Sequence, residues 1–246
     1  MRALLAAIGF LTRIPVPAKV FEDSRAQARS LVWYPLAGLL VGALLCALAW
    51  VLQTRPPLLS AALLLVVWVA LTGALHLDGL ADSADAWIGG MSGDAARRRE
   101  RTLEIMKDPR SGPVGVASVV LALLLKFAAL ASLPAAAWAV LLLAPVLARA
   151  SLTLAFLTTP YVRSGGLGQS LVKAPYAGSV AALILSAAGC AAAGWRGGLA
   201  VLVAVAIFAL WRRACLRRLQ GMTGDTCGAL TELVEAGVLV AWALSY

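Results

Sequence analysis

Seven long apolar runs, separated by short polar breaks, constrain the fold of this chain more than any other feature. They cover residues 31–52, 58–75, 114–133, 135–157, 177–195, 199–211 and 229–244. Each is about long enough to cross a hydrocarbon core of about 30 Å, although the sixth is short for a span. Backbone groups cannot stay unpaired in lipid, and the runs lack the alternating pattern of a membrane barrel strand. The sequence therefore predicts an all-α, polytopic membrane bundle of about seven transmembrane helices, within a range of six to eight.

The polar segments between the runs are too short for a separate soluble domain, so we expect residues 1–246 to form a single membrane domain. The longest of these segments, residues 77–111, is densely charged. Its residues 95–106 are rich in helix formers and Pro109 ends that run, which predicts a pair of helices outside the bilayer. The apolar residues 3–11 are followed by prolines and lack a convincing cleavage site, which favours an interfacial or re-entrant helix over a signal peptide.

The distribution of basic residues orients the bundle. If the N-terminus is cytoplasmic, one face collects seventeen of the 21 lysines and arginines, whereas the opposite face has only Arg55 and Arg196. The seventeen are Arg2, Arg13, Lys19, Arg25, Arg29, Arg97, Arg98, Arg99, Arg101, Lys107, Arg110, Arg163, Lys173, Arg212, Arg213, Arg217 and Arg218. This asymmetry predicts that the N-terminus, the acidic residues and the chemistry are cytoplasmic. The net charge of +9 then reflects topology and attraction to the anionic lipid bilayer, so nucleic acid is not an expected partner.

Three aspartates gather where the second apolar run ends, in the sequence HLDGLADSADAW at residues 76–87. If this stretch is helical, Asp78, Asp82 and Asp85 have i, i+4, i+7 spacing and project from one face. Carboxylates so close together raise one another's pKa, so a divalent cation or a cationic partner is the simplest way to keep them ionised. The pattern predicts a metal site that faces water at the membrane surface. The neighbouring His76 is either a structural hydrogen-bonding residue or a base, and the sequence leaves both open.

A second group of charges lies in residues 101–115. Glu104 and Asp108 are four residues apart and precede Arg110 and a glycine-flanked approach to the next apolar run. Carboxylates and an arginine beside flexible backbone suit a bound phosphate and its metal. The arginine-rich residues 97–101 are also consistent with a plain solvated helix.

Two further groups lie near the remaining runs. Asp225, in a glycine-containing stretch, precedes Glu232 and Glu235 in the last run; a cap would explain Asp225, but not the two glutamates. Acidic groups at that depth are costly and usually functional. Arg163 lies in the glycine-rich residues 160–168, after the intramembrane Arg149, and offers a cation to an anionic substrate. Together, these residues predict a magnesium-dependent reaction of a phosphorylated, partly lipophilic substrate.

Several blocks, in this order, closely resemble the adenosylcobinamide-GDP ribazoletransferase family, or cobalamin (5'-phosphate) synthases. The blocks are FLTRIPVP at residues 10–17, HLDGLADSAD at 76–85, LEIMKD at 103–108, and TGD at 223–225 with Gly228, Ala229 and Glu232. The resemblance runs essentially end to end. It implies a multi-pass enzyme of the cell inner membrane that needs Mg²⁺. Such an enzyme joins adenosylcobinamide-GDP to α-ribazole or its 5'-phosphate, forms adenosylcobalamin or its phosphate, and releases GMP.

The resemblance also implies roles for the candidate residues. Asp78, Asp82 and Asp85 would be the metal-binding motif, and the blocks around Asp108 and Asp225 would complete the site. The expected metal ligands are Asp78, Asp82, Asp85 and Glu232; the expected catalytic residues are His76, Glu104 and Asp108; and the expected substrate-binding residues are Arg13, Arg110, Arg149, Arg163 and Asp225. The base remains open among His76, Glu104 and a site aspartate. Because a corrin ring is too large for a buried pocket, we expect a broad cleft at the cytoplasmic surface.

Two other functions fit the sequence less well. CDP-alcohol phosphotransferases have an Ala-Arg pair after their Asp-Gly, where this chain has Ala81-Asp82, and Asp94 has no aspartate four residues later. A membrane transporter would use intramembrane charges along a path, but the carboxylates gather on one face and the chain has no visible inverted repeat. A homo-oligomer and contacts with other cobalamin-pathway enzymes are possible partners.

Overall fold

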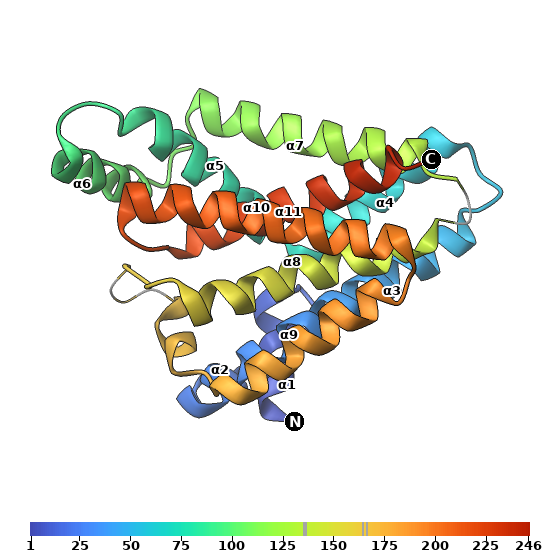
Figure 1. Cartoon of the computed structure of the whole chain (residues 1–246), viewed down its shortest axis with the longest axis horizontal. Helices are drawn as coiled ribbons and strands as arrows, with labels where there is room; N and C mark the ends of the chain where they lie inside the picture. The colour runs from blue at the N-terminus through green and yellow to red at the C-terminus, as the bar shows by residue number, and fades with distance from the viewer. Residues whose placement is uncertain (135–136, 164, 166) are drawn as a thin grey trace.

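The computed structural model is helical throughout and describes residues 1–134, 137–163, 165 and 167–246 (Figure 1). Within these residues the chain forms eleven α-helices and three short 3₁₀ helices. They are α1 (Arg2–Leu11), η1 (Ala18–Phe21), α2 (Ser24–Ser30), η2 (Leu31–Trp33), α3 (Tyr34–Val51), α4 (Pro57–Thr72), α5 (Leu75–Gly89), α6 (Ala95–Ile105), α7 (Pro113–Ser132), α8 (Trp138–Thr158), η3 (Leu167–Lys173), α9 (Tyr176–Ala191), α10 (Trp195–Leu219) and α11 (Gly224–Ala243).

All seven apolar runs coincide with helices, which confirms the all-α membrane bundle. By length and composition, five described helical stretches can cross a membrane: Ser24–Val51, α7, α8, α10 and α11. The pair α4 and α5 makes a sixth span if it is taken as one broken element, and the 16-residue α9 is shorter. The sixth run, residues 199–211, looked short for a span in the sequence. In the structure it is part of the 25-residue α10, which is long enough to cross a membrane. That helix continues through the arginines after the apolar run, so hydropathy alone underestimates its length.

A sharp break separates α4 from α5. Gly73 and Ala74 both have positive φ, at 62° and 57°, and the two helices differ in direction by 87°. Arg13 packs its side chain on Gly73, and its backbone N–H donates to Leu71 O over 2.7 Å. The aspartates therefore have the helical spacing that the sequence predicts, but on a new helix that leaves the direction of the apolar run. The polar α5 is not among the five stretches that can cross a membrane by themselves.

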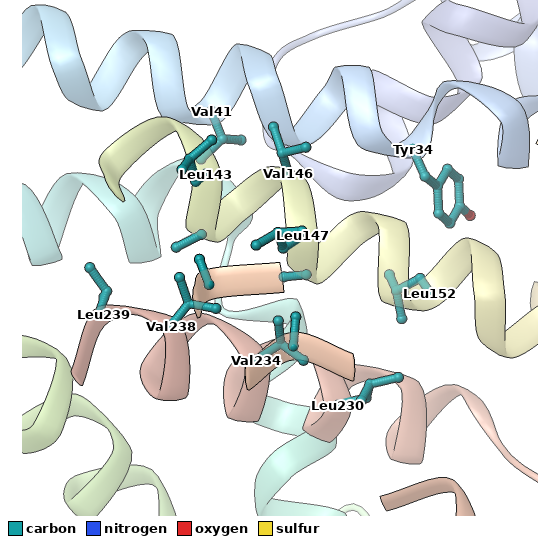
Figure 2. Close-up of a cluster of buried hydrophobic side chains, with 14 of the residues drawn as sticks. Tyr34, Val41, Leu143, Val146, Leu147, Leu152, Leu230, Val234, Val238 and Leu239 are labelled. Atoms are coloured by element: carbon teal, nitrogen blue, oxygen red, sulfur yellow. The ribbon is translucent and has the colours of Figure 1, made fainter. Parts of the chain in front are cut away.

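The core is built around α8, which packs against α3, α9, α10 and α11. Figure 2 shows the interlocking aliphatic side chains of this core, among them Val41 of α3, Leu147 of α8 and Val234 of α11. Helices α3 and α8 come close because Gly42 faces the α8 backbone, where a Cβ would lie 2.7 Å from Leu141 O. Small residues allow such close packing of helices in a bilayer.

In the segment for which a pair of helices was expected, residues 77–111, the structure has α6 and most of α5, which begins at Leu75. Asp94 caps α6 by accepting a hydrogen bond from the Arg97 backbone N–H over 2.9 Å. Arg99 Nε donates to Leu219 O over 2.8 Å, and Arg218 Nε donates to Thr102 Oγ1 over 2.9 Å. These two hydrogen bonds attach α6 to the end of α10, so α6 is not a freely solvated helix.

Candidate active site

A cavity of about 610 Å³ opens where α1, α3, α5, α8 and the start of α11 meet the chain after α8. The polar side chains that line it are those of His76, Asp78, Lys107, Arg163, Thr223 and Asp225, together with two tyrosines. This volume is within the usual range for small-molecule sites. It is too small to enclose a corrin, so the expected broad cleft is here a more limited cavity.

Two glycines allow α5 and α11 to cross in direct contact. A Cβ on Gly79 would lie 2.7 Å from Asp225 O, and a Cβ on Gly228 would lie 3.2 Å from the Gly79 Cα. Real Cβ atoms almost never come as close as the first of these distances. The crossing brings the carboxylates of Asp78 and Asp225 to the same cavity.

Asp225 is held by a cation from another segment. Arg163 Nη1 donates to Asp225 Oδ2 over 2.8 Å, and Thr223 Oγ1 lies 3.4 Å from the same oxygen. The alignment depends on an isolated parallel bridge, in which the Val162 N–H donates to Met222 O over 2.9 Å. The cap of α11 is Thr223, not Asp225, so the capping interpretation of Asp225 was wrong. Two residues of the glycine-rich stretch, Ser164 and Gly166, lie outside the described residues.

The pKa of Asp82 reflects the carboxylates around it. Burial, followed by the nearby charges of Asp78, Asp225 and Asp85, raises the pKa of Asp82 to about 6, while Arg163 opposes this shift. Among the described residues, no group of three or more His, Cys, Asp or Glu side chains forms a ready-made metal cage. Mg²⁺ usually keeps several waters and takes one or two carboxylates together with substrate phosphates. The hard oxygen donors and their uncompensated charge therefore fit Mg²⁺ bound together with a phosphorylated substrate.

Asp85 differs from its two neighbours. Its oxygens accept hydrogen bonds from the Gly112 N–H over 2.6 Å and from the Gly115 N–H over 2.8 Å, at the start of α7. A carboxylate at a helix N-terminus satisfies unpaired N–H groups and the helix dipole. The helical phase of the three aspartates was right, but the approach of α7 gives Asp85 a capping position.

Glu232 and Arg149, expected as a metal ligand and a substrate-binding residue, do not line the cavity. Lys126 Nζ lies 2.5 Å from an oxygen of each of Glu232 and Glu235, and Arg149 pairs with Glu235. All four side chains are buried. Two cations and two carboxylates compensate one another there, because an unpaired charge in the bundle interior would be costly. This buried quartet corrects both expectations.

The second group of charges faces away from the cavity. Arg110 forms an exposed ion pair with Asp108 at 2.7 Å, and this lowers the pKa of Asp108 to about 2. Glu104 pairs with Arg101 at 2.9 Å on the exposed side of α6. The neighbours of these residues, Leu103, Met106 and Lys107, line the cavity instead. Sequence reasoning missed Lys107, although its i, i+4 spacing from the apolar Leu103 indicates the inward face. Arg13 does not line the cavity either, because its side chain packs on Gly73.

His76 is 3% exposed and lines the cavity. Neither ring nitrogen has a hydrogen-bond partner in the described part of the chain. A buried imidazole normally finds a partner within the protein. The geometry therefore favours a group that meets a ligand over a structural hydrogen-bonding residue.

The family model described as cobalamin-5-phosphate synthase matches residues 3–243. Proteins named adenosylcobinamide-GDP ribazoletransferase from Stutzerimonas stutzeri (strain A1501) and Pseudomonas aeruginosa (strain UCBPP-PA14) are each 56% identical over 246 residues, covering 99% of this chain and 98% of the relative. The protein of that name from Pseudomonas putida (strain GB-1) is 52% identical, with 99% of each chain covered. No solved structure matches.

Proposed function

The chain belongs to the cobalamin-5-phosphate synthase family, and we propose that the cavity between α5 and α11 is the place where it carries out the family's reaction. It is a membrane enzyme that joins adenosylcobinamide-GDP to α-ribazole or α-ribazole-5'-phosphate and releases GMP. The observation that carries the proposal is the gathering of Asp78, Asp225 and Arg163 around one cavity, with Asp82 electrostatically coupled to them. Anionic and cationic side chains side by side suit a diphosphate and its metal.

The reaction exchanges the phosphoanhydride bond of a diphosphate for a phosphate ester bond. A ribose hydroxyl oxygen of the ribazole bonds to the β-phosphorus, which carries the cobinamide aminopropanol, and the bond from that phosphorus to the bridging oxygen breaks. GMP leaves with the electron pair. Arg163 and Lys107 bind the non-bridging oxygens and orient the phosphorus for in-line attack, which supplies most of the catalysis in reactions of this kind.

His76 is assigned to the attacking hydroxyl. Burial lowers the pKa of His76 to about 3, so the imidazole is neutral and accepts a hydrogen bond from the hydroxyl. Such a weak base suffices when the transition state is loose, because the hydroxyl proton becomes strongly acidic only as the bond to phosphorus forms. Glu104 and Asp108 are less suited, since both face solvent.

Mg²⁺ is the proposed cofactor, with Asp78, Asp82 and Asp225 as the residues that would hold it. When bound, the ion supplies charge neutralisation on the diphosphate and on the departing GMP. Arg163 then has a second role, because it orients the Asp225 carboxylate toward the cavity. Asp85 positions α7 and is not proposed as a ligand.

The proposed location is the cell inner membrane, with the cavity and the N-terminus facing the cytoplasm. Figure 1 places α6 and the C-terminus at opposite ends of the bundle. Arg196, one of the two basic residues expected outside, contacts Ser245 near the C-terminus. The excess of arginine at the α6 end therefore supports a cytoplasmic cavity. Homo-oligomers and complexes with other cobalamin-pathway enzymes stay predictions, to be tested by co-purification.

The two other functions have less support. A transporter would need its intramembrane charges to line a path, but Lys126, Arg149 and the two glutamates bind one another in the interior. A CDP-alcohol phosphotransferase would require a motif that the chain departs from at Asp82. The match to the cobalamin-5-phosphate synthase model over residues 3–243 favours the ribazoletransferase reaction over both.

GMP release tests the proposal. Protein purified in detergent and supplied with lipid is given adenosylcobinamide-GDP and α-ribazole-5'-phosphate, with and without Mg²⁺. We expect GMP and an equal amount of corrinoid product only with Mg²⁺, loss of both in Asp78→Asn, and near-normal rates in the control Asp108→Asn. Full turnover without divalent cations, or in Asp78→Asn, would contradict the assignment of the cavity and its metal.

A further inference from the structure

The cavity has two chemically different parts. The side chains contributed by α1, α3, α8 and η3 are apolar or aromatic, and we call them the apolar wall: Phe10, Leu11, Tyr34, Leu152, Phe156 and Leu171. They belong to the main hydrophobic core or pack against it. The charged lining residues come from α5, α11 and the segments around residues 107 and 163. The charged part accounts for phosphate and metal, and the apolar wall has no role in the reaction described above.

The aromatic rings of the apolar wall are fixed by stacking. Phe10 and Tyr34 have ring centroids 6.4 Å apart with an angle of 18° between the rings. Phe156 stacks on Tyr161 at 5.8 Å and 25°. Gly168 packs closely against this second pair of rings. A Cβ at this position would lie 2.9 Å from the Tyr161 ring and 3.0 Å from the Phe156 ring. Figure 2 shows the Tyr34 ring projecting from α3 toward the part of α8 that carries Leu152. Flat rings held in place are suited to stacking on a flat ligand.

We propose that the apolar wall is the subsite for the aromatic base of the ribazole substrate. This inference rests on the proposed function of the cavity. The base is a fused ring with carbon and methyl edges, so it loses few hydrogen bonds when it leaves water. The guanine of the other substrate carries donors and acceptors on its edges, and burying them against phenylalanine and leucine would leave them unpaired. The corrin is too large to be enclosed by the cavity of about 610 Å³, so most of it must lie outside.

The arrangement also orients the nucleophile. With the base on the apolar wall, the ribose extends toward the charged part of the cavity, where Arg163 and Lys107 hold the diphosphate. The subsite therefore determines the affinity of the enzyme for α-ribazole. It also determines the selectivity of the enzyme for an apolar base over a polar one. The base of α-ribazole is a benzimidazole. Adenine in its place would bring an exocyclic amine against the apolar wall, where the amine would have no hydrogen-bond partner.

Steady-state kinetics with both substrates tests the subsite. Phe156→Leu and Phe10→Leu keep apolar volume but remove a ring, so we expect the KM for α-ribazole to rise about three- to tenfold. The KM for adenosylcobinamide-GDP should stay within about twofold, and kcat should fall by less than about fivefold because the rest of the apolar wall still orients the ribose. The matched control is Phe127→Leu, which removes a ring that packs on the core but does not line the cavity. It should leave all three quantities unchanged.

The selectivity of the variants gives a second readout. The wild type should prefer α-ribazole to the α-nucleoside of adenine, and Phe156→Leu should narrow that preference by the same three- to tenfold. A selective rise in the KM for adenosylcobinamide-GDP would assign the apolar wall to guanine and overturn the proposal. Unchanged KM values for both substrates in both folded variants would overturn it as well. Failure of the proposed function itself is distinguishable, because the wild-type protein would then release no GMP.

Discussion

Asp225 at the start of α11 accepts a hydrogen bond from Arg163 over 2.8 Å, although 62 residues separate the two in the chain. The pair lies where α5 and α11 cross, so a cation and the carboxylates of two separate motifs share one region. The Arg163 guanidinium thus balances part of the negative charge of Asp225 beside Asp78. This pairing connects the glycine-rich segment after α8 to the start of α11.

Arg163→Ala is expected to lower kcat/KM for adenosylcobinamide-GDP by about ten- to a hundredfold, since charge-assisted hydrogen bonds contribute about 1.5–3 kcal/mol. The variant loses a phosphate-binding cation and leaves Asp225 unpaired. The control is Arg110→Ala, which breaks an ion pair exposed to solvent and should change kcat/KM by less than about fivefold. Equal effects of the two changes in a GMP-release assay would argue against the site.

Asp82→Asn and Asp85→Asn should separate metal binding from structure. Asp82→Asn is expected to abolish the response to Mg²⁺ while thermal stability is kept, because the change removes like-charge repulsion. Asp85→Asn replaces one of the two accepting oxygens by an NH2 group and leaves one backbone N–H unpaired, so we expect a loss of about 1–3 kcal/mol in stability and a retained response to Mg²⁺. Thermal unfolding in detergent and Mg²⁺ titration of the rate measure the two effects. Loss of the Mg²⁺ response in both variants would return Asp85 to the metal site.

Gly79→Ala should disrupt the crossing of α5 and α11. The new methyl group would lie 2.7 Å from the Asp225 carbonyl oxygen, so the helices must separate, at about 1–3 kcal/mol, and turnover should be lost. The matched control is Gly198→Ala in α10, where nothing lies within 4 Å of the added carbon. That change should be neutral or slightly stabilising because alanine favours helix. Normal turnover in Gly79→Ala would show that the close crossing is not required.

Lys126→Met is expected to destabilise the protein by about 3–5 kcal/mol, because it removes the cation that two buried glutamates share. Adding Glu232→Leu should recover much of this loss, since the Arg149–Glu235 pair remains. Turnover per folded molecule in the double variant should resemble the wild type. A double variant that is as unstable as Lys126→Met, judged by thermal unfolding, would mean that the quartet does not act as a charge-balanced unit.

The requirement for Mg²⁺ should depend on pH through Asp82, whose pKa is raised from 3.8 to about 6. Protons compete with the metal below that value, so the Mg²⁺ concentration for half-maximal rate should fall about tenfold per pH unit up to about pH 6, then level off. Without Mg²⁺ the folded state holds this proton more tightly than the unfolded state. Stability should therefore decrease as pH rises from about 4 to about 6. Asp82→Asn should lack both trends.

Sequence alone determined the helical elements, because the requirement to pair backbone groups in lipid acts locally on each apolar run. It also determined the helical phase of Asp78, Asp82 and Asp85, which share one helix. The family resemblance, read from motifs such as HLDGLADSAD, indicated the reaction. The helices and the phase of the aspartates depend on residues within a few turns of one another, so the period of the α-helix is enough to predict them.

The tertiary structure decided which charges meet. Glu232 lies in the last span, where hydropathy marks it as unusual, but its partner Lys126 is 106 residues away. The direction of α5 depends on a left-handed break at Gly73 and Ala74 that hydropathy does not register. Lys107 faces the cavity, while its neighbour Asp108 faces solvent with Arg110. Acidic side chains with similar spacing in the sequence therefore have different roles in the structure. Contacts between distant helices determine which carboxylate pairs with a cation and which is available to bind a metal.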